Sequence, residues 1–220
     1  SHERGTQTKS RLCPVMAVVS HQKPTRENTM KKFIYIMIGM LCLASLTANA
    51  ANLKDEVPAP KTKLEEFSAK TGVVIVRGFE EIGTVSGHYN TSIKVEAKEF
   101  VNVSTGKKEY GITIEVKKED GRYDKESTSY IDYDEISSLI SGIDYIAKVN
   151  KSATKFSNFQ ADYNTKGDFK VSTFSMNEKI MVAIASGRIG SVSAYYNISS
   201  LPEIRGVIEK AKSKIDALKK

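Results

Sequence analysis

The stretches that decide the fold are residues 110–116, YGITIEV, and residues 131–146, IDYDEISSLISGIDYI. Every second residue of the first stretch is apolar, which predicts a β-strand with one buried and one solvated face. In the second stretch, isoleucine and leucine recur at spacings of three and four residues, which predicts a helix with an apolar stripe. Asp132 and Glu135 fit a capping box at the start of that helix. A strand and a helix with these patterns are expected to share one core.

Three further β-type segments surround the first stretch, at residues 73–85, 92–104 and 123–131. Two glycines interrupt the earliest of them, which predicts a bent or bulged strand. The Asp-Gly pair at residues 120–121 predicts a hairpin between the last two strands. Upstream of all four, Thr62 and Glu65 fit the capping box of a short helix.

The second half of the chain repeats this order. Its strand candidates are residues 155–163, 168–175, 179–186 and 191–197, followed by an amphipathic helix that begins at Ser200 and Glu203. We therefore predict an α+β fold in which antiparallel twisted sheets pack against two amphipathic helices. The pseudo-repeats 73–149 and 155–219 favour a tandem ββββα duplication.

The N-terminal part of the chain has the three parts of a secretory signal peptide at residues 30–50. Met30-Lys31-Lys32 is the basic region, residues 33–46 are an apolar run, and a small-residue site predicts cleavage between Ala50 and Ala51. A membrane anchor would need about 20 apolar residues, which is longer than this run. We expect a protein with no membrane anchor in its mature chain, exported to the periplasm or the extracellular medium.

These boundaries divide the chain into four parts. Residues 1–29 are interpreted as an upstream extension without function, because they precede a complete signal peptide at 30–50. Residues 51–61, with two prolines, are predicted to form a flexible leader. Residues 62–220 are predicted to form a single exported α+β domain.

The apparent basic character of the chain belongs mostly to the part that precedes the predicted cleavage site. The full sequence carries 33 Lys plus Arg and 26 Asp plus Glu. Residues 1–50 contain seven of the basic and two of the acidic residues, so 26 and 24 remain and the net charge falls from +7 to about +2. Such a balance makes nucleic acid an unlikely partner, since phosphate binding draws on an excess of Lys and Arg.

The mature chain also lacks the residues that several kinds of functional site require. Both cysteines, Cys13 and Cys42, precede the cleavage site, and only His88 remains of three histidines. A disulfide, a cysteine nucleophile and a thiolate metal site are therefore excluded, and one histidine cannot form a multi-histidine zinc site. No Walker, dinucleotide-binding, nucleophile-elbow or EF-hand spacing occurs. We predict no catalytic residue, no metal and no cofactor.

Five residues are candidates for ligand binding, each with a structural alternative. Arg122 and Arg188 follow a glycine in a turn and could present a guanidinium to an anion, but a plain hairpin turn has the same sequence. Arg77 interrupts an apolar strand, where edge protection is the alternative. Tyr195 and Tyr196 could form a stacking platform, although tyrosine also suits a half-buried strand.

The two strand-strand-strand-strand-helix units, from about residue 73 to 218, resemble the Whirly-type single-stranded DNA-binding fold. The lysine-glycine-lysine segment of that family has an echo in Thr165-Lys166-Gly167-Asp168, where an acid replaces the second lysine. The resemblance implies twisted sheets of an oligomer and, in that family, strands that carry nucleic acid.

Three functional hypotheses remain from the sequence. The first is an exported, non-catalytic binding or interaction module for a ligand or protein of the envelope or the medium. The second is a nucleic-acid-binding protein with Whirly-like architecture. The third is a hydrolase with two carboxylates, for which the adjacent acids at 65–66, 80–81 and 119–120 are candidates. Sequence neighbours in a strand point to opposite faces, which disfavours the third.

Overall fold

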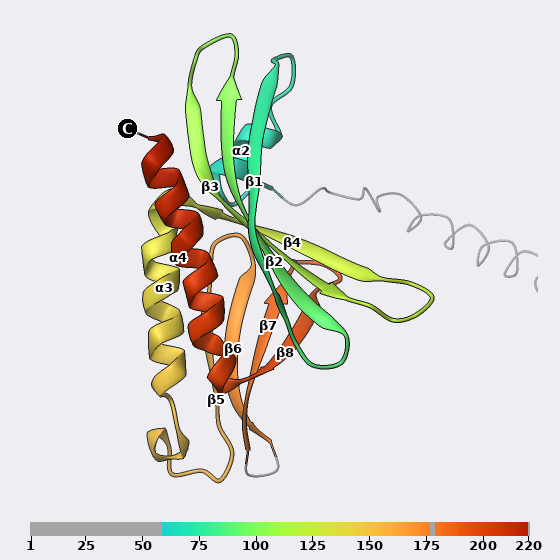
Figure 1. The fold of residues 1–220 in the computed structure, drawn as a ribbon, viewed down its shortest axis with the longest axis vertical. Coiled ribbons are helices and arrows are strands. Elements are labelled where there is room, and N and C mark those ends of the chain that lie inside the picture. The colour runs from blue at the N-terminus through green and yellow to red at the C-terminus, as the bar shows by residue number, and fades with distance from the viewer. Residues whose placement is uncertain (1–58, 177–178, 220) are drawn as a thin grey trace, which may run out of the picture. The chain divides into compact units, whose positions relative to one another are not determined.

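The structure is a computed structural model that describes residues 59–176 and 179–219. It contains two four-stranded antiparallel sheets and three α-helices (Figure 1). The predicted α+β class is therefore confirmed, and the order of elements is consistent with a duplication. The predicted extension, signal peptide and Ala50–Ala51 cleavage site lie outside the described residues.

The first sheet has the order β1-β2-β3-β4 and lies between two helices in sequence. Its elements are α2 (Lys63–Ser68), β1 (Ile75–Ser86), β2 (Thr91–Asn102), β3 (Lys108–Lys118), β4 (Lys125–Asp132) and α3 (Tyr133–Lys148). The register of β1 against β2 shifts between Glu81 and Gly83, which confirms the predicted bulge.

The second sheet has the order β5-β6-β7-β8. Its elements are β5 (Gln160–Asn164), β6 (Phe169–Met176), β7 (Lys179–Ser186), β8 (Val192–Asn197) and α4 (Leu201–Leu218), with short 3-10 turns at Lys151–Ala153 and Ile198–Ser200. The strand predicted from residue 155 begins only at Gln160, which pairs with Phe174 near the end of β6. Phe159 O still accepts the N–H of Ser175 at 3.0 Å, but β6 ends one residue later, at Met176, so little of β6 is left to pair with a strand that begins at residue 155.

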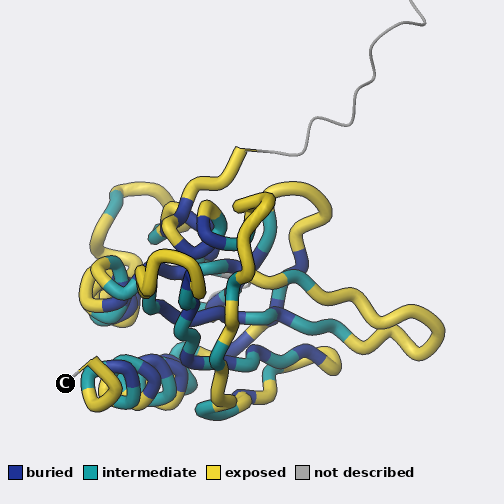
Figure 2. The backbone as a smooth tube through the Cα atoms, turned by 90° about the horizontal axis from the view of Figure 1, so that it is seen from above, coloured by how far each residue is buried: buried dark blue, intermediate teal, exposed yellow. Residues whose placement is uncertain are grey.

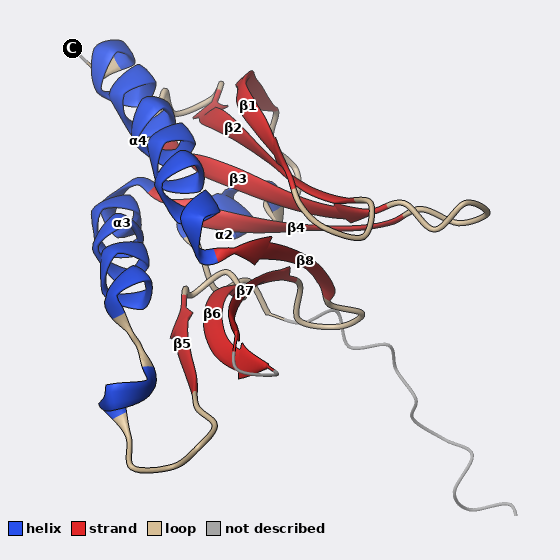
Figure 3. Cartoon of the chain, turned by 60° about the horizontal axis from the view of Figure 1, so that its bottom comes forward, coloured by secondary structure: helices blue, strands red, loops and turns tan. Residues whose placement is uncertain are grey.

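The core lies where the inner faces of the two sheets meet the helix pair. β3 packs against β7 and β8, and α3 packs against α4 (Figure 3). Figure 2 marks the buried residues in dark blue. The apolar side chains of the central strand β3 point inward, and Ile112, Ile114 and Val116 are fully buried. One cluster of buried side chains joins both sheets and both long helices, so neither repeat has a core of its own. Residues 59–219 are therefore expected to unfold as one cooperative unit.

Two of the three predicted capping boxes are wrong. Thr62 and Glu65 form theirs at α2, but Asp132 and Ser200 make no side-chain cap to the helices that follow them. The buried carboxylate of Asp132 accepts instead the backbone N–H groups of Lys63, at 2.9 Å, and Leu64, at 3.2 Å. Asp132 thus satisfies the first turn of α2, because that helix docks beside the end of β4.

Asp168 ties the β5–β6 turn to two other segments. Its carboxylate lies 2.7 Å from Lys61 Nζ and 2.7 Å from Arg188 Nε. Partial burial acts to raise the pKa of Asp168, but these two cations outweigh it, so the pKa is lowered below its ordinary 3.8. Asp168 is therefore ionised near neutral pH, and both ion pairs are present there.

We expect the free energy of unfolding to fall as the pH drops below about 4. A carboxyl whose folded pKa is depressed contributes stability above its unfolded pKa and loses it as the pH falls through the folded value. Asp168→Asn should lower the free energy of unfolding at pH 7 by about 1 kcal/mol. It should also reduce the further loss of stability as the pH falls from about 4 to 2, measured by urea unfolding from pH 2 to 7. Asn tolerates the left-handed backbone of residue 168, whose φ is 61°. If the variant lost as much stability as the wild type between about pH 4 and pH 2, this role of Asp168 would be contradicted.

Candidate functional site

A shallow groove of about 290 Å³ crosses the outer face of the second sheet. We call it the serine-alanine groove. It is lined by Gln160, Lys170, Ser172, Phe174, Ala183, Ala185, Ser191, Ser193 and Tyr195. Pockets that hold small ligands have volumes of about 300 to 1,000 Å³, so the groove is at the lower end of that range.

The floor of the groove follows from the register of three strands. Ser172 of β6 lies opposite Ala183 of β7, and Ala183 lies opposite Tyr195 of β8. In the next row, Ala185 lies opposite Ser193. Because Ser172, Ala183, Ala185 and Ser193 are small, the sheet surface is low between the taller side chains around them, such as Lys170 and Tyr195.

A polar network lies on the β5 side of the groove. The carboxylate of Asp162 accepts hydrogen bonds from Ser172 Oγ and from Gln160 Nε2, the latter at 2.9 Å, and Lys170 Nζ is 4.0 Å away. Partial burial acts to raise the pKa of Asp162, but these bonds and the charge of Lys170 outweigh it and lower the pKa. The amide of Gln160 and the ammonium of Lys170, which line the groove, thus lie next to the ionised carboxylate of Asp162 beside it.

Aromatic rings lie at the β8 end of the groove. Tyr195 is 37% exposed, and its ring meets that of Tyr89 edge to face at a centroid distance of 6.1 Å. Tyr89 comes from the β1–β2 loop, which is joined to β8 because His88 N donates to Tyr195 O at 2.7 Å. Tyr89 has a φ of 59°, an unfavourable conformation for a bulky residue. The β1–β2 loop of the first sheet therefore places one ring against the Tyr195 ring, at the side of the groove in the second sheet.

Gly87 is required for this junction. A Cβ at residue 87 would lie 2.7 Å from Thr91 Oγ1 and 2.8 Å from Tyr195 O. Any larger residue would push the loop away from β8, and the Tyr89 ring would move with it.

The two predicted tyrosines have opposite positions. Tyr195 points into the groove, whereas Tyr196 is 1% exposed and donates its hydroxyl to Val85 O at 3.0 Å in the core. Burial raises the pKa of the Tyr196 phenol well above its ordinary value. Tyr196 therefore belongs to the core and presents no ring at the surface.

The three predicted arginines lie on different elements, none of them in the groove. The Arg188 guanidinium in the β7–β8 turn is held by Asp168 and by Ala59 O, 3.0 Å from Nη1. Arg77 of β1 lies over the Phe100 ring, 5.6 Å from its centroid, and Arg122 is exposed in the β3–β4 turn. The structure does not bring them together into an anion site.

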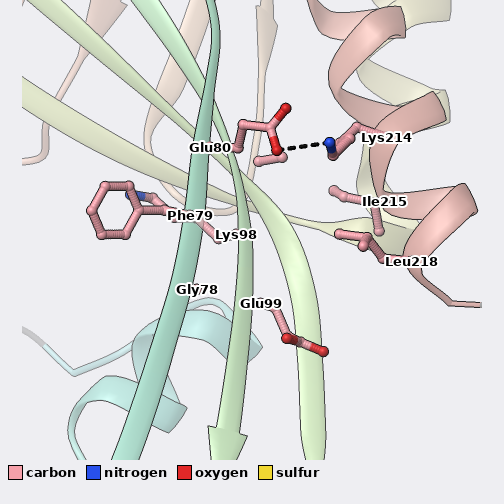
Figure 4. A pocket seen from close by; sticks show the side chains of 9 residues that line it. Gly78, Phe79, Glu80, Lys98, Glu99, Lys214, Ile215 and Leu218 are labelled. Atoms are coloured by element: carbon pink, nitrogen blue, oxygen red, sulfur yellow. Dashed lines mark ion pairs between the residues drawn. The ribbon is translucent and has the colours of Figure 1, made fainter.

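A smaller pocket of about 110 Å³ lies between β1, β2 and the end of α4 (Figure 4). It contains Glu80 and Glu99, the two acids that a hydrolase would need in one place. Glu80 pairs with Lys214 at 2.7 Å. Hydrogen bonds from Lys108 and Tyr110 lower the pKa of Glu99, whereas a general acid needs a raised pKa. Glu99 is therefore unsuited to be the protonated acid of that mechanism.

The groove floor is the part of the site that sequence reasoning missed. Ser172, Ala183 and Ser193 look unremarkable one at a time, and Phe174 stands on the same outer face. The sequence does show small residues at outward-facing positions of three successive strands. Only the strand register, however, shows that these residues lie next to one another and form a groove floor.

The described part of the chain has neither a cluster of metal ligands nor a helix that could span a membrane. Within residues 59–176 and 179–219, no group of three His, Cys, Asp or Glu side chains could hold a metal ion. Over the same ranges, no helix is both long enough and apolar enough to cross a membrane.

Comparisons with protein-family models, with curated proteins and with solved structures give no significant match for this chain.

Proposed function

We propose that the chain is an exported, non-catalytic binding module and that the serine-alanine groove is its binding surface. The observation that carries the proposal is the groove's lining, in which a low Ser/Ala floor lies between Lys170 and Tyr195. Beside the groove, the Asp162 carboxylate lies 4.0 Å from Lys170 Nζ, and the Tyr89 ring meets that of Tyr195. Concave sites with a few well-placed polar groups and aromatic side chains are typical of small-ligand binding.

The ligand class that fits this lining best is a neutral oligosaccharide. Sugar hydroxyls can both donate to the Asp162 carboxylate and accept from Gln160 and Lys170, while the apolar face of a ring can lie on Tyr195. Opposite charges at Asp162 and Lys170 give the groove little net charge, which disfavours a strongly charged ligand. Ser172 and Ser193 add hydroxyls on the floor.

The test is a calorimetric titration of the purified chain with a panel of neutral hexose and N-acetylhexosamine oligosaccharides. We expect saturable binding with a Kd in the micromolar to millimolar range by at least one of them, as is usual for a shallow site. Absence of binding across the panel would contradict the proposed ligand class.

A second candidate ligand is single-stranded nucleic acid, favoured by the exposed Tyr89 and Tyr195 rings, on which bases could stack. Against it, Lys170 is the one cation among the described residues that line the groove, and Asp162 is beside it. Binding of an oligonucleotide that weakens steeply with salt would support this candidate over the oligosaccharide. No binding at low salt would exclude it.

Export is tested separately by intact mass. We expect the protein recovered from the envelope or medium of its host to begin at Ala51, because the small-residue site at 48–50 directs cleavage there. A mass that retains residues 30–50 in those fractions would contradict the predicted processing.

A further inference from the structure

Strand β1 is an exposed edge of the first sheet. Within the described residues, β1 pairs with β2 alone. Its side chains are unusually exposed for an apolar strand, with Phe79 at 70% and Val76 at 52%. An open edge that carries apolar side chains is a template for pairing with another strand.

The backbone groups that are free to pair can be assigned from the hydrogen bonds. Val103 N donates to Val74 O at 3.1 Å, so residue 74 directs its polar groups toward β2. Along an antiparallel strand the direction alternates with each residue. Residues 77, 79 and 81 therefore direct their N–H and C=O groups away from β2, toward the open side.

The sequence of this edge is complementary to itself. When two copies are placed antiparallel with Phe79 opposite Phe79, Arg77 of each faces Glu81 of the other. The outward backbone groups coincide in this register, because it pairs 79 with 79 and 77 with 81. Opposite charges directly across two strands are stabilising. Edge charges normally keep other strands away, but here they match one particular partner.

We propose that β1 pairs with β1 of a second copy of this chain about a two-fold axis at Phe79, which joins two four-stranded sheets into one. This is an isologous contact, in which the same patch serves both subunits. The two Phe79 rings would lie together on the outer face, near Lys98, whose Nζ is 4.6 Å from the Phe79 centroid. The bulge between Glu81 and Gly83 ends the regular pairing on one side. The contact itself closes after two copies, because it uses the β1 edge of both.

Charge reversal tests this register. The chain is studied by sedimentation velocity over a wide concentration range, as wild type, Arg77→Glu, Glu81→Arg and the double variant. We expect a reversible dimer whose Kd rises by about tenfold or more in each single variant and returns to within about threefold in the double variant. Arg122→Glu, the same charge change in an exposed turn, should leave the Kd unchanged.

Disulfide trapping tests the position of the axis. Residues facing each other in a hydrogen-bonded antiparallel pair have Cα atoms about 5.5 Å apart, within disulfide range. With Cys13 and Cys42 replaced by Ser, Phe79→Cys should form a covalent dimer in mild oxidant, whereas Tyr123→Cys in the β3–β4 turn should not.

Three results would overturn the proposal. They are a monomer at every concentration, a dimer indifferent to Arg77→Glu, and a double variant that is not restored. Pairing of β1 with a strand of a different protein, in a chain that stays monomeric by itself, would also overturn the assignment to a second copy. Because the groove lies on the other sheet, none of these results bears on the proposed function.

Discussion

The double variant Ala183→Ile, Ala185→Ile is expected to weaken ligand binding to the groove by about a hundredfold or more, because it builds steric clashes across the floor. Both side chains project from the outer face of β7, where they line the groove and are partly exposed. Isoleucine suits a strand and has a stiff side chain, so it fills the floor without disturbing the core on the opposite face.

The matched control places the same kind of side chain on an outer face elsewhere. Thr128 of β4 is exposed and does not line the groove, so Thr128→Ile should leave the affinity unchanged. Circular dichroism should give the wild-type melting curve for all variants. Full affinity in the filled variant, with the fold intact, would place the ligand outside the groove.

Removing the aromatic end of the groove should have a smaller effect of the same sign. Tyr195→Ala loses a ring that a ligand can contact and leaves Tyr89 without its partner, so we expect about a tenfold weaker affinity. Tyr145→Ala removes an exposed ring from α3 and should have no effect. Titration calorimetry of the two variants separates a groove contact from general loss of aromatic surface.

The second large effect concerns stability. Gly167→Ala is expected to lower the free energy of unfolding by about 3 kcal/mol or more, because overpacking a fixed junction displaces backbone. A Cβ at residue 167 would lie 1.9 Å from Tyr130 O and 3.1 Å from Thr62 Cγ2. The turn cannot simply retreat, since Lys166 N donates to Glu135 Oε1 at 2.9 Å on one side of residue 167 and Asp168 pairs with Lys61 and Arg188 on the other.

Gly206→Ala is the matched control for that prediction. Residue 206 lies in α4, and a Cβ there would have no neighbour within 4 Å. Ala is favoured over Gly in a helix, so this variant should gain about 0.5 to 1 kcal/mol. Urea unfolding measures both changes. A neutral Gly167→Ala would contradict the close approach of the β5–β6 turn to β4.

The secondary structure could be predicted because its signals are local. Alternation within residues 110–116 and the three-four spacing from Ile136 to Ile146 each reflect one element burying one face. The strand predicted from residue 155 begins late because pairing depends on where β6 ends, and no residue near 155 carries that information. Local residue patterns therefore predict which helices and strands form, whereas the length of the neighbouring strand determines where a strand begins.

The caps show where local reasoning fails. Asp132 and Glu135 have the spacing of a capping box, yet Asp132 caps α2, whose first residues lie 69 positions earlier. Glu135 Oε1 accepts the Lys166 N–H at 2.9 Å. A carboxylate satisfies whichever N–H groups the tertiary structure brings to it, so residue spacing is a weak guide for a buried acid.

The candidate site was predictable only in part. Strand phase separates Tyr195 from Tyr196, because Val192 and Ala194 share the inner phase with Tyr196. The groove floor needs the register of β6, β7 and β8, and Tyr89 needs a bridge between the two sheets. These are contacts between distant segments, which a single sequence does not specify.

The most direct test of the groove as a binding surface is an NMR titration of the isotope-labelled chain with the neutral oligosaccharide panel, following backbone amide shifts. The account predicts that at least one oligosaccharide shifts amides of β6, β7 and β8 and of the loop around Tyr89, with the amides of α3 unmoved. Shifts centred on the small pocket between β1 and α4, or no shift with any member of the panel, would contradict it.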